Sequence, residues 1–345
     1  MSRIAAENWE REKARAAEAE AARRDPQNDK GRGREAGSPG QIPGRGWKDV
    51  AWRVYQEISN DRVLLVAAGV TFYLLLALAP LLTALVSIYG LFLDPANISE
   101  QAAALAGVVP GGGVEILTDQ LKRLSEAGAS TLGFAFIFAL LIALWSANAG
   151  MKSLFDAMNI AYDEEEKRGF VKYTLVTLAF TVSLIVAIIV LIGFNAAFTF
   201  FQESIGLKIP NRIVDLITAG LALLVLLTFI AALYRFGPSR ADAEWKWITP
   251  GAVFATFGAI VVSALFSYYV ANFGTYNETY GSLGAVVGFL TWLWLMMVML
   301  VMGGEINSEL EHQTAQDTTT GPDQPMGERG AYMADNVGRR YGVDG

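Results

Sequence analysis

Long runs of apolar residues fill the middle of the chain and are separated by short polar stretches. Six of these runs carry no charged residue over about 20 positions, the length that a helix needs to cross a hydrocarbon layer of roughly 30 Å. They cover Val63–Leu93, Leu132–Met151, Tyr173–Phe201, Leu216–Tyr234, Ile248–Ala271 and Leu283–Gly304. The pattern predicts an all-α polytopic membrane protein, a bundle of six transmembrane helices.

The two ends of the chain contrast with this apolar middle. Residues 1–46 are rich first in Ala, Glu and Arg and then in Gly and Pro, while residues 312–345 are rich in Thr, Gly and Asp. Segments of this composition bury too little apolar surface to offset the entropy of ordering. We therefore expect two largely disordered cytoplasmic tails, 1–46 and 312–345, around a six-helix transmembrane domain of residues 47–311.

The transmembrane domain is expected to begin with an amphipathic helix. In residues 47–58 apolar side chains recur at helical spacing, and the charged ones fall largely on the other side. Such a helix either lies on the membrane surface, with its tryptophans at headgroup depth, or packs on the body of the protein. The longest connection, residues 94–131, is expected to hold two short helices that cap the outer face.

Basic residues near the span ends predict the orientation, because loops rich in Lys and Arg stay in the cytoplasm. They concentrate before the first span, between the second and third, and between the fourth and fifth. They are Arg45, Lys48, Arg53, Arg62, Lys152, Lys167, Arg168, Lys172, Arg235, Arg240 and Lys246. We therefore expect an N-in/C-in topology, with both termini in the cytoplasm.

Composition narrows the chemistry. The chain is 53% hydrophobic and 18% charged, which is too apolar for an ordinary soluble domain of 345 residues. It has no cysteine, so it has no disulfide, no thiolate metal site and no cysteine nucleophile. Because no span or loop collects a complete set of catalytic or metal-binding groups, we expect no enzymatic activity, no cofactor and no metal.

Glycine and proline positions predict local features of the spans. Pro80 interrupts the backbone hydrogen bonds of the first span and is expected to kink it. Gly281, Gly284 and Gly288 present a smooth face on the sixth span, and Gly251 lies on a similar face of the fifth. Small faces let helices approach closely, within one chain or across a dimer.

Polar residues in or near the spans are the candidates for a functional path. An amide such as Asn148 is costly to bury unpaired, so it is expected either to bond a neighbouring helix or to line a polar path. Glu305 ends the last span, where it either anchors the helix end or acts as a functional carboxylate at the inner mouth. With Tyr73, Tyr269 and Tyr280, these residues form the candidate polar path or groove.

Several of these residues lie in segments that together resemble the YihY/BrkB family of bacterial inner-membrane proteins, some of which carry the historical label ribonuclease BN. The segments are GVTFYLLLALAP from Gly69, LWSAN from Leu144, FDAMNIAY from Phe155, YRFGP from Tyr234, WITPGA from Trp247, YGSL from Tyr280 and GGEINSE from Gly303. In the last segment Gly304 replaces an alanine that is common in the family. The resemblance covers about residues 47–311 and implies a six-span protein of poorly defined activity.

The resemblance implies a ribonuclease only through the historical label. The matched segments hold aromatic residues, glycines and a few polar groups, which cannot activate water on a phosphodiester. We therefore expect a multi-pass protein of the bacterial inner (plasma) membrane, with transport or envelope maintenance of a lipid or amphiphile as its function. The alternative is a non-transporting membrane scaffold. Membrane lipids are the expected partners, a homo-oligomer stays open, and no nucleic acid is expected.

Overall fold

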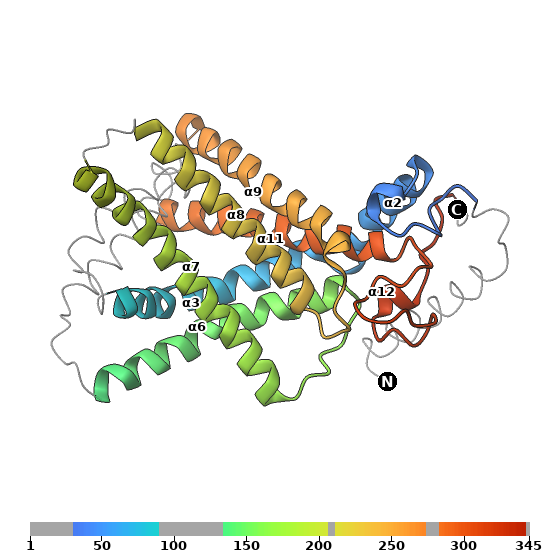
Figure 1. Cartoon of the computed structure of the whole chain (residues 1–345), viewed down its shortest axis with the longest axis horizontal. Helices are drawn as coiled ribbons and strands as arrows, with labels where there is room; N and C mark the ends of the chain where they lie inside the picture. The colour runs from blue at the N-terminus through green and yellow to red at the C-terminus, as the bar shows by residue number, and fades with distance from the viewer. Residues whose placement is uncertain (1–29, 90–133, 206–210, 274–282, 343–345) are drawn as a thin grey trace.

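The long helices of the protein follow the apolar runs of its sequence. A computed structural model describes residues 30–89, 134–205, 211–273 and 283–342. Its long helices are α3 (Val63–Tyr89), α6 (Phe134–Ala161), α7 (Phe170–Ile205), α8 (Asn211–Phe236), α9 (Trp245–Phe273) and α11 (Leu283–Glu311) (Figure 1). The shorter ones are η1 (Pro39–Gln41), α2 (Gly44–Asn60) and α12 (Tyr332–Asp335). The described residues form no β-sheet, so the predicted all-α fold is confirmed.

Five of these helices are long and apolar enough to cross a membrane: α3, α7, α8, α9 and α11. In a hydrocarbon layer a helix satisfies its backbone groups internally, which suits runs that are apolar on every side. The sixth long helix, α6, is not among the five. The count of six spans and the N-in/C-in orientation therefore stay predictions. The expected cap of residues 94–131 lies outside the described residues.

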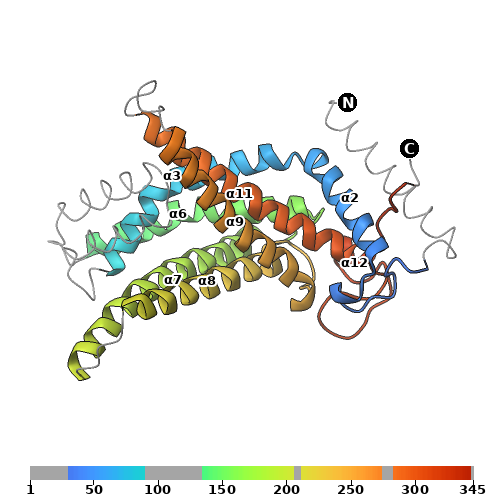
Figure 2. The same ribbon diagram turned by 90° about the horizontal axis from the view of Figure 1, so that it is seen from above.

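The main hydrophobic core lies at one end of the bundle, and a smaller cluster of Ala84, Ala143 and Ile185 joins α3, α6 and α7 further along. The main hydrophobic core is formed by Val63, Val70, Met151, Leu154, Phe155, Ala157, Met158, Ile230, Leu233, Tyr234, Ala243, Ile248, Ala252, Ala255 and Val301. All lie toward the end that also bears α2, α12 and residues 313–342, here called the tail-bearing end. From it, α7 and α8 diverge from α3, α6 and α11 (Figure 2).

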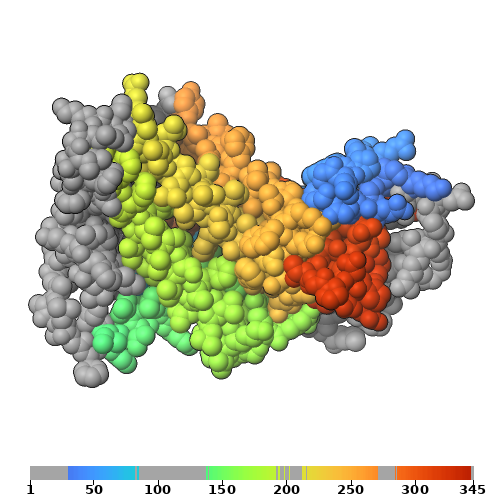
Figure 3. All heavy atoms as spheres, in the orientation of Figure 1, coloured from blue at the N-terminus to red at the C-terminus, as the bar shows by residue number. Residues whose placement is uncertain are grey.

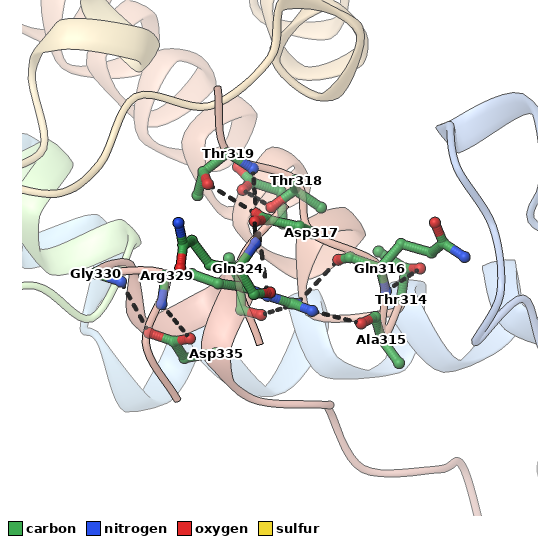
Figure 4. A network of polar contacts seen from close by, with 12 residues as sticks. Thr314, Ala315, Gln316, Asp317, Thr318, Thr319, Gln324, Arg329, Gly330 and Asp335 are labelled. Carbon is green, nitrogen blue, oxygen red and sulfur yellow. Dashed lines mark hydrogen bonds and ion pairs between the residues drawn. The ribbon is translucent and has the colours of Figure 1, made fainter. Parts of the chain in front are cut away.

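The segments expected to be disordered fold onto this end instead. Residues 30–60 and 313–342 lie side by side over it (Figure 3). Arg329 holds the second segment together by donating to the carbonyl oxygens of Ala315, Gln316, Gln324 and Ala334 (Figure 4). The structure thus gives residues 30–46 and 312–342 a folded conformation, in contrast to the disorder expected for them. The physical reason is that polar bonds to the chain's own backbone add to a small apolar core containing Ala36 and Ile42.

The amphipathic segment forms α2, and α2 packs on the protein's own body. Val50 and Val54 contact Trp247 and Leu310 in a small core, whereas Tyr55 on the opposite side is exposed. Of the two interpretations left open by the sequence, the structure therefore has the second.

Candidate functional site

The last turns of α11 combine polar sequence with complete burial. Glu305, Asn307, Ser308, Glu309, Glu311, His312 and Gln313 are each at most 8% exposed. Buried polar groups are normally hydrogen-bonded, and buried charges are paired. The partners of these residues therefore define what this part of the molecule, the buried polar end of α11, is built to do.

Glycine brings α9 against this end of α11. A Cβ atom added at Gly251 would collide with the carbonyl oxygen of Gly303 and with the side chain of Asn307. Asn307 uses the space to accept a hydrogen bond from the Gly251 backbone N–H at 2.7 Å. The close approach predicted for Gly251 is thus made to Gly303. It is absent at Gly288, where an added Cβ would meet no atom within 4 Å.

The predicted small face of the sixth span also includes Gly284 and Gly281. Gly284 is buried, and Gly281 lies outside the described residues. Pro80 lies inside α3, and the kink expected there stays a prediction.

Two buried ion pairs fasten neighbouring segments to α11. Arg53 of α2 pairs with Glu309 and also donates to the carbonyl oxygen of Arg339 at 2.7 Å. Arg240, between α8 and α9, donates to both carboxylate oxygens of Glu311 at 2.8 Å, and both side chains are fully buried. Burial alone would lower the pKa of Arg240, but the Glu311 carboxylate raises it above its ordinary value. A buried pair of this kind is costly to break.

Glu305, in the same turns of α11, has no partner of its own among the described residues. It is fully buried, and neither carboxylate oxygen accepts a hydrogen bond from the described residues. The hydroxyl of Tyr162 and the amide nitrogen of Asn307 are also buried; they interact with each other, and no other described residue forms a hydrogen bond with either atom. The charges that act on Glu305 come mainly from Asp61, Glu57, Glu309 and Asp163. Among the described residues, the ion pairs at this helix end are thus made by Glu309 and Glu311 and not by Glu305.

Glu57 shows how these carboxylates influence one another. It lies on α2, and burial followed by the negative charges of Glu309, Asp61 and Asp163 raises its pKa to about 8. The contact between α2 and α11 therefore contains a group that changes charge near neutral pH.

Asn148 forms a separate polar contact inside the bundle. Its side-chain oxygen accepts a hydrogen bond from the Thr181 hydroxyl at 3.2 Å, and both residues are buried. The contact joins α6 to α7. On α6, Ala161 lies beside Gly304, the neighbour of Glu305. Asn148 lies 13 residues before Ala161, which is about 20 Å along the helix. Asn148 and Glu305 are therefore at different depths.

The predicted path residues do not meet in one place. Tyr73 and Tyr269 are 48% and 45% exposed on the outer surface of α3 and α9, whereas Asn148 and Glu305 are buried. Tyr280 lies outside the described residues. Two residues are inside the bundle and two are on its surface, so these four line no common groove.

Sequence reasoning missed the roles of Arg53, Arg240 and Glu311. In the sequence analysis, the two arginines serve only as signals of membrane orientation. Glu311 serves there only as the last residue of the transmembrane domain. Arg53 and Glu309 are 256 residues apart in the chain, so no local spacing links them. The sequence offered one sign of these ion pairs. Further charged residues, among them Glu311, follow shortly after the GGEINSE segment.

The buried carboxylates do not assemble a metal site in the described residues. Among residues 30–89, 134–205, 211–273 and 283–342, no group of three or more His, Asp or Glu could hold a metal ion. The acidic run 163–166 is engaged elsewhere, since Glu164 pairs with Lys167 and Glu166 pairs with Arg168.

The chain is similar to known membrane proteins over most of its length. The family model described as Virulence factor BrkB matches residues 54–327. The putative ribonuclease-like protein YfkH of Bacillus subtilis is 31% identical over 257 residues, which cover 71% of this chain and 88% of that protein.

More distant relatives are named only as membrane proteins. A UPF0761 membrane protein of Chlorobium luteolum is 26% identical over 254 residues, covering 73% of this chain and 57% of that protein. One of Neisseria meningitidis serogroup B is 26% identical over 280 residues, covering 76% and 63%. The chain thus spans between 57% and 63% of the length of these two relatives. No solved structure matches it.

Proposed function

The chain belongs to the BrkB family of integral membrane proteins, and from this premise we propose that it handles a lipid or another amphiphile within the membrane. The role is transport or envelope maintenance in the bacterial inner membrane. One observation carries the proposal: the main core and the buried ion pairs lie at the tail-bearing end, while each candidate span leaves most of its residues unburied.

The uncovered helix surface is large and apolar. Between 11% and 28% of the residues in each of the five candidate spans are buried inside the chain, with the lowest value in α8. Leu216 and Leu224 of α8, for example, are 74% and 59% exposed. Diverging helices with such faces offer an amphiphile lateral entry from the bilayer, whereas an aqueous pore needs a polar lining.

The buried polar end of α11 supplies the closed side of this arrangement. The pairs Arg53–Glu309 and Arg240–Glu311 hold α2 and the α8–α9 connection against α11. In the proposal this end stays shut while the opposite end admits the amphiphile.

Reconstitution tests the proposal directly. Purified protein is placed in liposomes that contain trace phospholipid, lysophospholipid or isoprenoid phosphate with a fluorescent headgroup, and a membrane-impermeant reductant reports movement between leaflets. We expect faster movement of at least one of these lipids than in protein-free liposomes. Equal rates for all three, with the protein shown to be folded, would remove the proposal.

The scaffold alternative has less support. It assigns partner recruitment to the charged tails, but residues 313–342 direct many of their polar groups to their own chain. Mild detergent extraction and affinity purification separate the two functions. A partner recovered in a fixed ratio would favour the scaffold, and a lone homo-oligomer would count against it.

The name of YfkH raises ribonuclease activity as a further alternative, which we do not adopt. The purified chain is expected to leave RNA intact with and without divalent cations. Metal-dependent cleavage that disappears in Glu305→Gln would reverse this view.

A further inference from the structure

We propose that Lys152 binds the phosphate of an anionic phospholipid whose acyl chains lie along the outer face of α6. The inference rests on the proposed function and names the class of amphiphile. It is carried by a lysine that has aromatic neighbours but no acidic partner among the described residues, at the end of an exposed apolar stripe.

Lys152 is held in place by aromatic rings. Its Nζ atom lies 5.4, 5.2 and 5.7 Å from the ring centroids of Trp145, Phe170 and Tyr173. An ammonium group at such distances is attracted by the electron-rich face of a ring. The same atom donates a hydrogen bond to the Thr174 hydroxyl at 3.1 Å. The position of the charge is therefore fixed by two helices.

The charge of Lys152 is not neutralised by the described residues. Lys167 and Lys246 each pair with a glutamate, but Lys152 forms no ion pair with the parts of the chain that the structure describes. Asp156, one turn further along α6, instead accepts a hydrogen bond from the Tyr173 hydroxyl at 2.7 Å. An ammonium group has three donors, and one of them is used by Thr174. Two donors remain for an anion.

The face of α6 below Lys152 is apolar and exposed. Phe138, Leu141, Ile142 and Trp145 are between 52% and 67% exposed and recur at helical spacing. Lys152 follows Trp145 by seven residues, two turns on the same face. Phe138 lies 14 residues before Lys152, or about 21 Å at 1.5 Å per residue, which exceeds the roughly 15 Å of one leaflet. The stripe is thus long enough for one acyl chain.

The surroundings favour a phosphate over a neutral headgroup. Trp145, Phe170 and Tyr173 are the residue types that settle at the membrane–water boundary, where phosphates lie. Lys172 is exposed nearby, and the guanidinium of Arg168, which is paired with Glu166, lies 5.5 Å from the Tyr173 ring centroid. Hydrogen bonds from an ammonium to a phosphate are charge-assisted and strong. A lysine that merely extends toward water attracts anionic lipids only through its diffuse charge, whereas a site at Lys152 holds one phosphate at a fixed position.

Fluorescence quenching by brominated lipids tests the site in the full chain. Vesicles contain the protein with brominated phosphatidylglycerol or brominated phosphatidylcholine, in otherwise equal composition. We expect stronger tryptophan quenching by phosphatidylglycerol, and a smaller difference in Trp145→Phe, which removes the reporter beside Lys152 and leaves the other seven tryptophans. Equal quenching by the two lipids in the unaltered protein would overturn the proposal.

Charge variants then assign the effect to Lys152. Lys152→Gln is expected to lower the retention of phosphatidylglycerol in native mass spectrometry about tenfold, while Lys152→Arg retains most of it. Lys246→Gln, which alters an exposed lysine paired with Glu244, is the matched control and should change nothing. Equal loss in Lys152→Gln and Lys246→Gln would contradict the assignment, with circular dichroism confirming that both variants fold.

Two further comparisons complete the test. The first distinguishes a lipid phosphate from a free phosphate, and the second distinguishes this inference from the proposed function. Inorganic phosphate added to the vesicles should not displace phosphatidylglycerol, and displacement would identify a free-anion site instead. Lipid movement without any preference for phosphatidylglycerol refutes this inference but leaves the proposed function. Selective binding at Lys152 without movement of any lipid supports this inference and refutes the function.

Discussion

At the scale of single residues, the buried polar end of α11 contains two kinds of carboxylate. Glu309 and Glu311 are paired with arginines, whereas Glu305 has no hydrogen-bond partner among the described residues. Burial without a partner is costly and contributes no contact to stability. This distinction predicts opposite consequences for chemically identical substitutions.

Glu311→Gln should destabilise the protein by about 3 kcal/mol, because Arg240 would remain buried without its counter-charge. Glu305→Gln keeps the side-chain shape and removes no observed contact, so its melting temperature should equal or exceed that of the unaltered protein. Thermal unfolding in detergent compares the two variants. A larger loss for Glu305→Gln than for Glu311→Gln would show that Glu305 is the structurally paired residue.

Gly251 is the other residue at which geometry leaves little freedom. Gly251→Ala should lower stability by about 1–3 kcal/mol, because the added methyl group collides with the backbone of Gly303. Gly288→Ala is its control in α11 and should be neutral or stabilising by up to about 1 kcal/mol, since alanine favours helix and nothing lies nearby. The same unfolding assay measures both. Equal effects would argue against the close α9–α11 contact.

At the scale of elements, α2 is the part most sensitive to pH. The pKa of Glu57 is raised to about 8 in the folded protein, from an ordinary value of 4.5. The folded state therefore disfavours the charged form, so the contribution of Glu57 to docking is fully present below pH 4.5. It is lost as the pH rises toward 8.

The mobility of α2 is therefore expected to rise between pH 6 and pH 9. The chain has no cysteine, so a single spin label at a cysteine replacing exposed Tyr55 reports on α2 alone. Glu57→Gln should abolish the change across this range, while Glu165→Gln, in the acidic run after α6, should retain it. A spectrum that is independent of pH in the unaltered background would contradict the charge coupling.

The elements also show how far the sequence could be interpreted. The apolar runs predicted the long helices, because twenty uncharged residues have few alternatives to a helix in lipid. The folded state of residues 313–342 was not predictable, since it depends on Arg329 meeting four carbonyl groups within the same segment. The pairing of Arg53 with Glu309 needs the packing of α2 on α11, which no local pattern reveals.

Within the candidate site, the sequence identified Glu305 but not its surroundings. The position of a carboxylate after two glycines at the end of an apolar run was sufficient to select it. Whether Glu305 is paired at the helix end or is a free carboxylate depends on where Arg53 and Arg240 lie, and the sequence does not give their positions. Tyr73 and Tyr269 were selected as aromatic residues in matched segments, and their exposure on the outside of the bundle could not be inferred from residue type.

At the scale of the whole molecule, packing is concentrated at the tail-bearing end. Folded tail segments, two buried ion pairs and the main hydrophobic core all lie there. The helices beyond it expose apolar side chains that the chain itself does not cover. We assign these faces to lipid and to the amphiphile that enters between them.

Accessibility of spin labels tests that assignment most directly. A cysteine replacing Leu224 of α8, 59% exposed, carries the label in the reconstituted protein, and one replacing Val301 of the core serves as the buried reference. The account predicts that lipid-soluble oxygen broadens the Leu224 signal strongly while a water-soluble nickel complex does not. Strong broadening by the nickel complex would reveal an aqueous pore, and protection from both reagents would reveal a covering protein surface; either result would contradict the account.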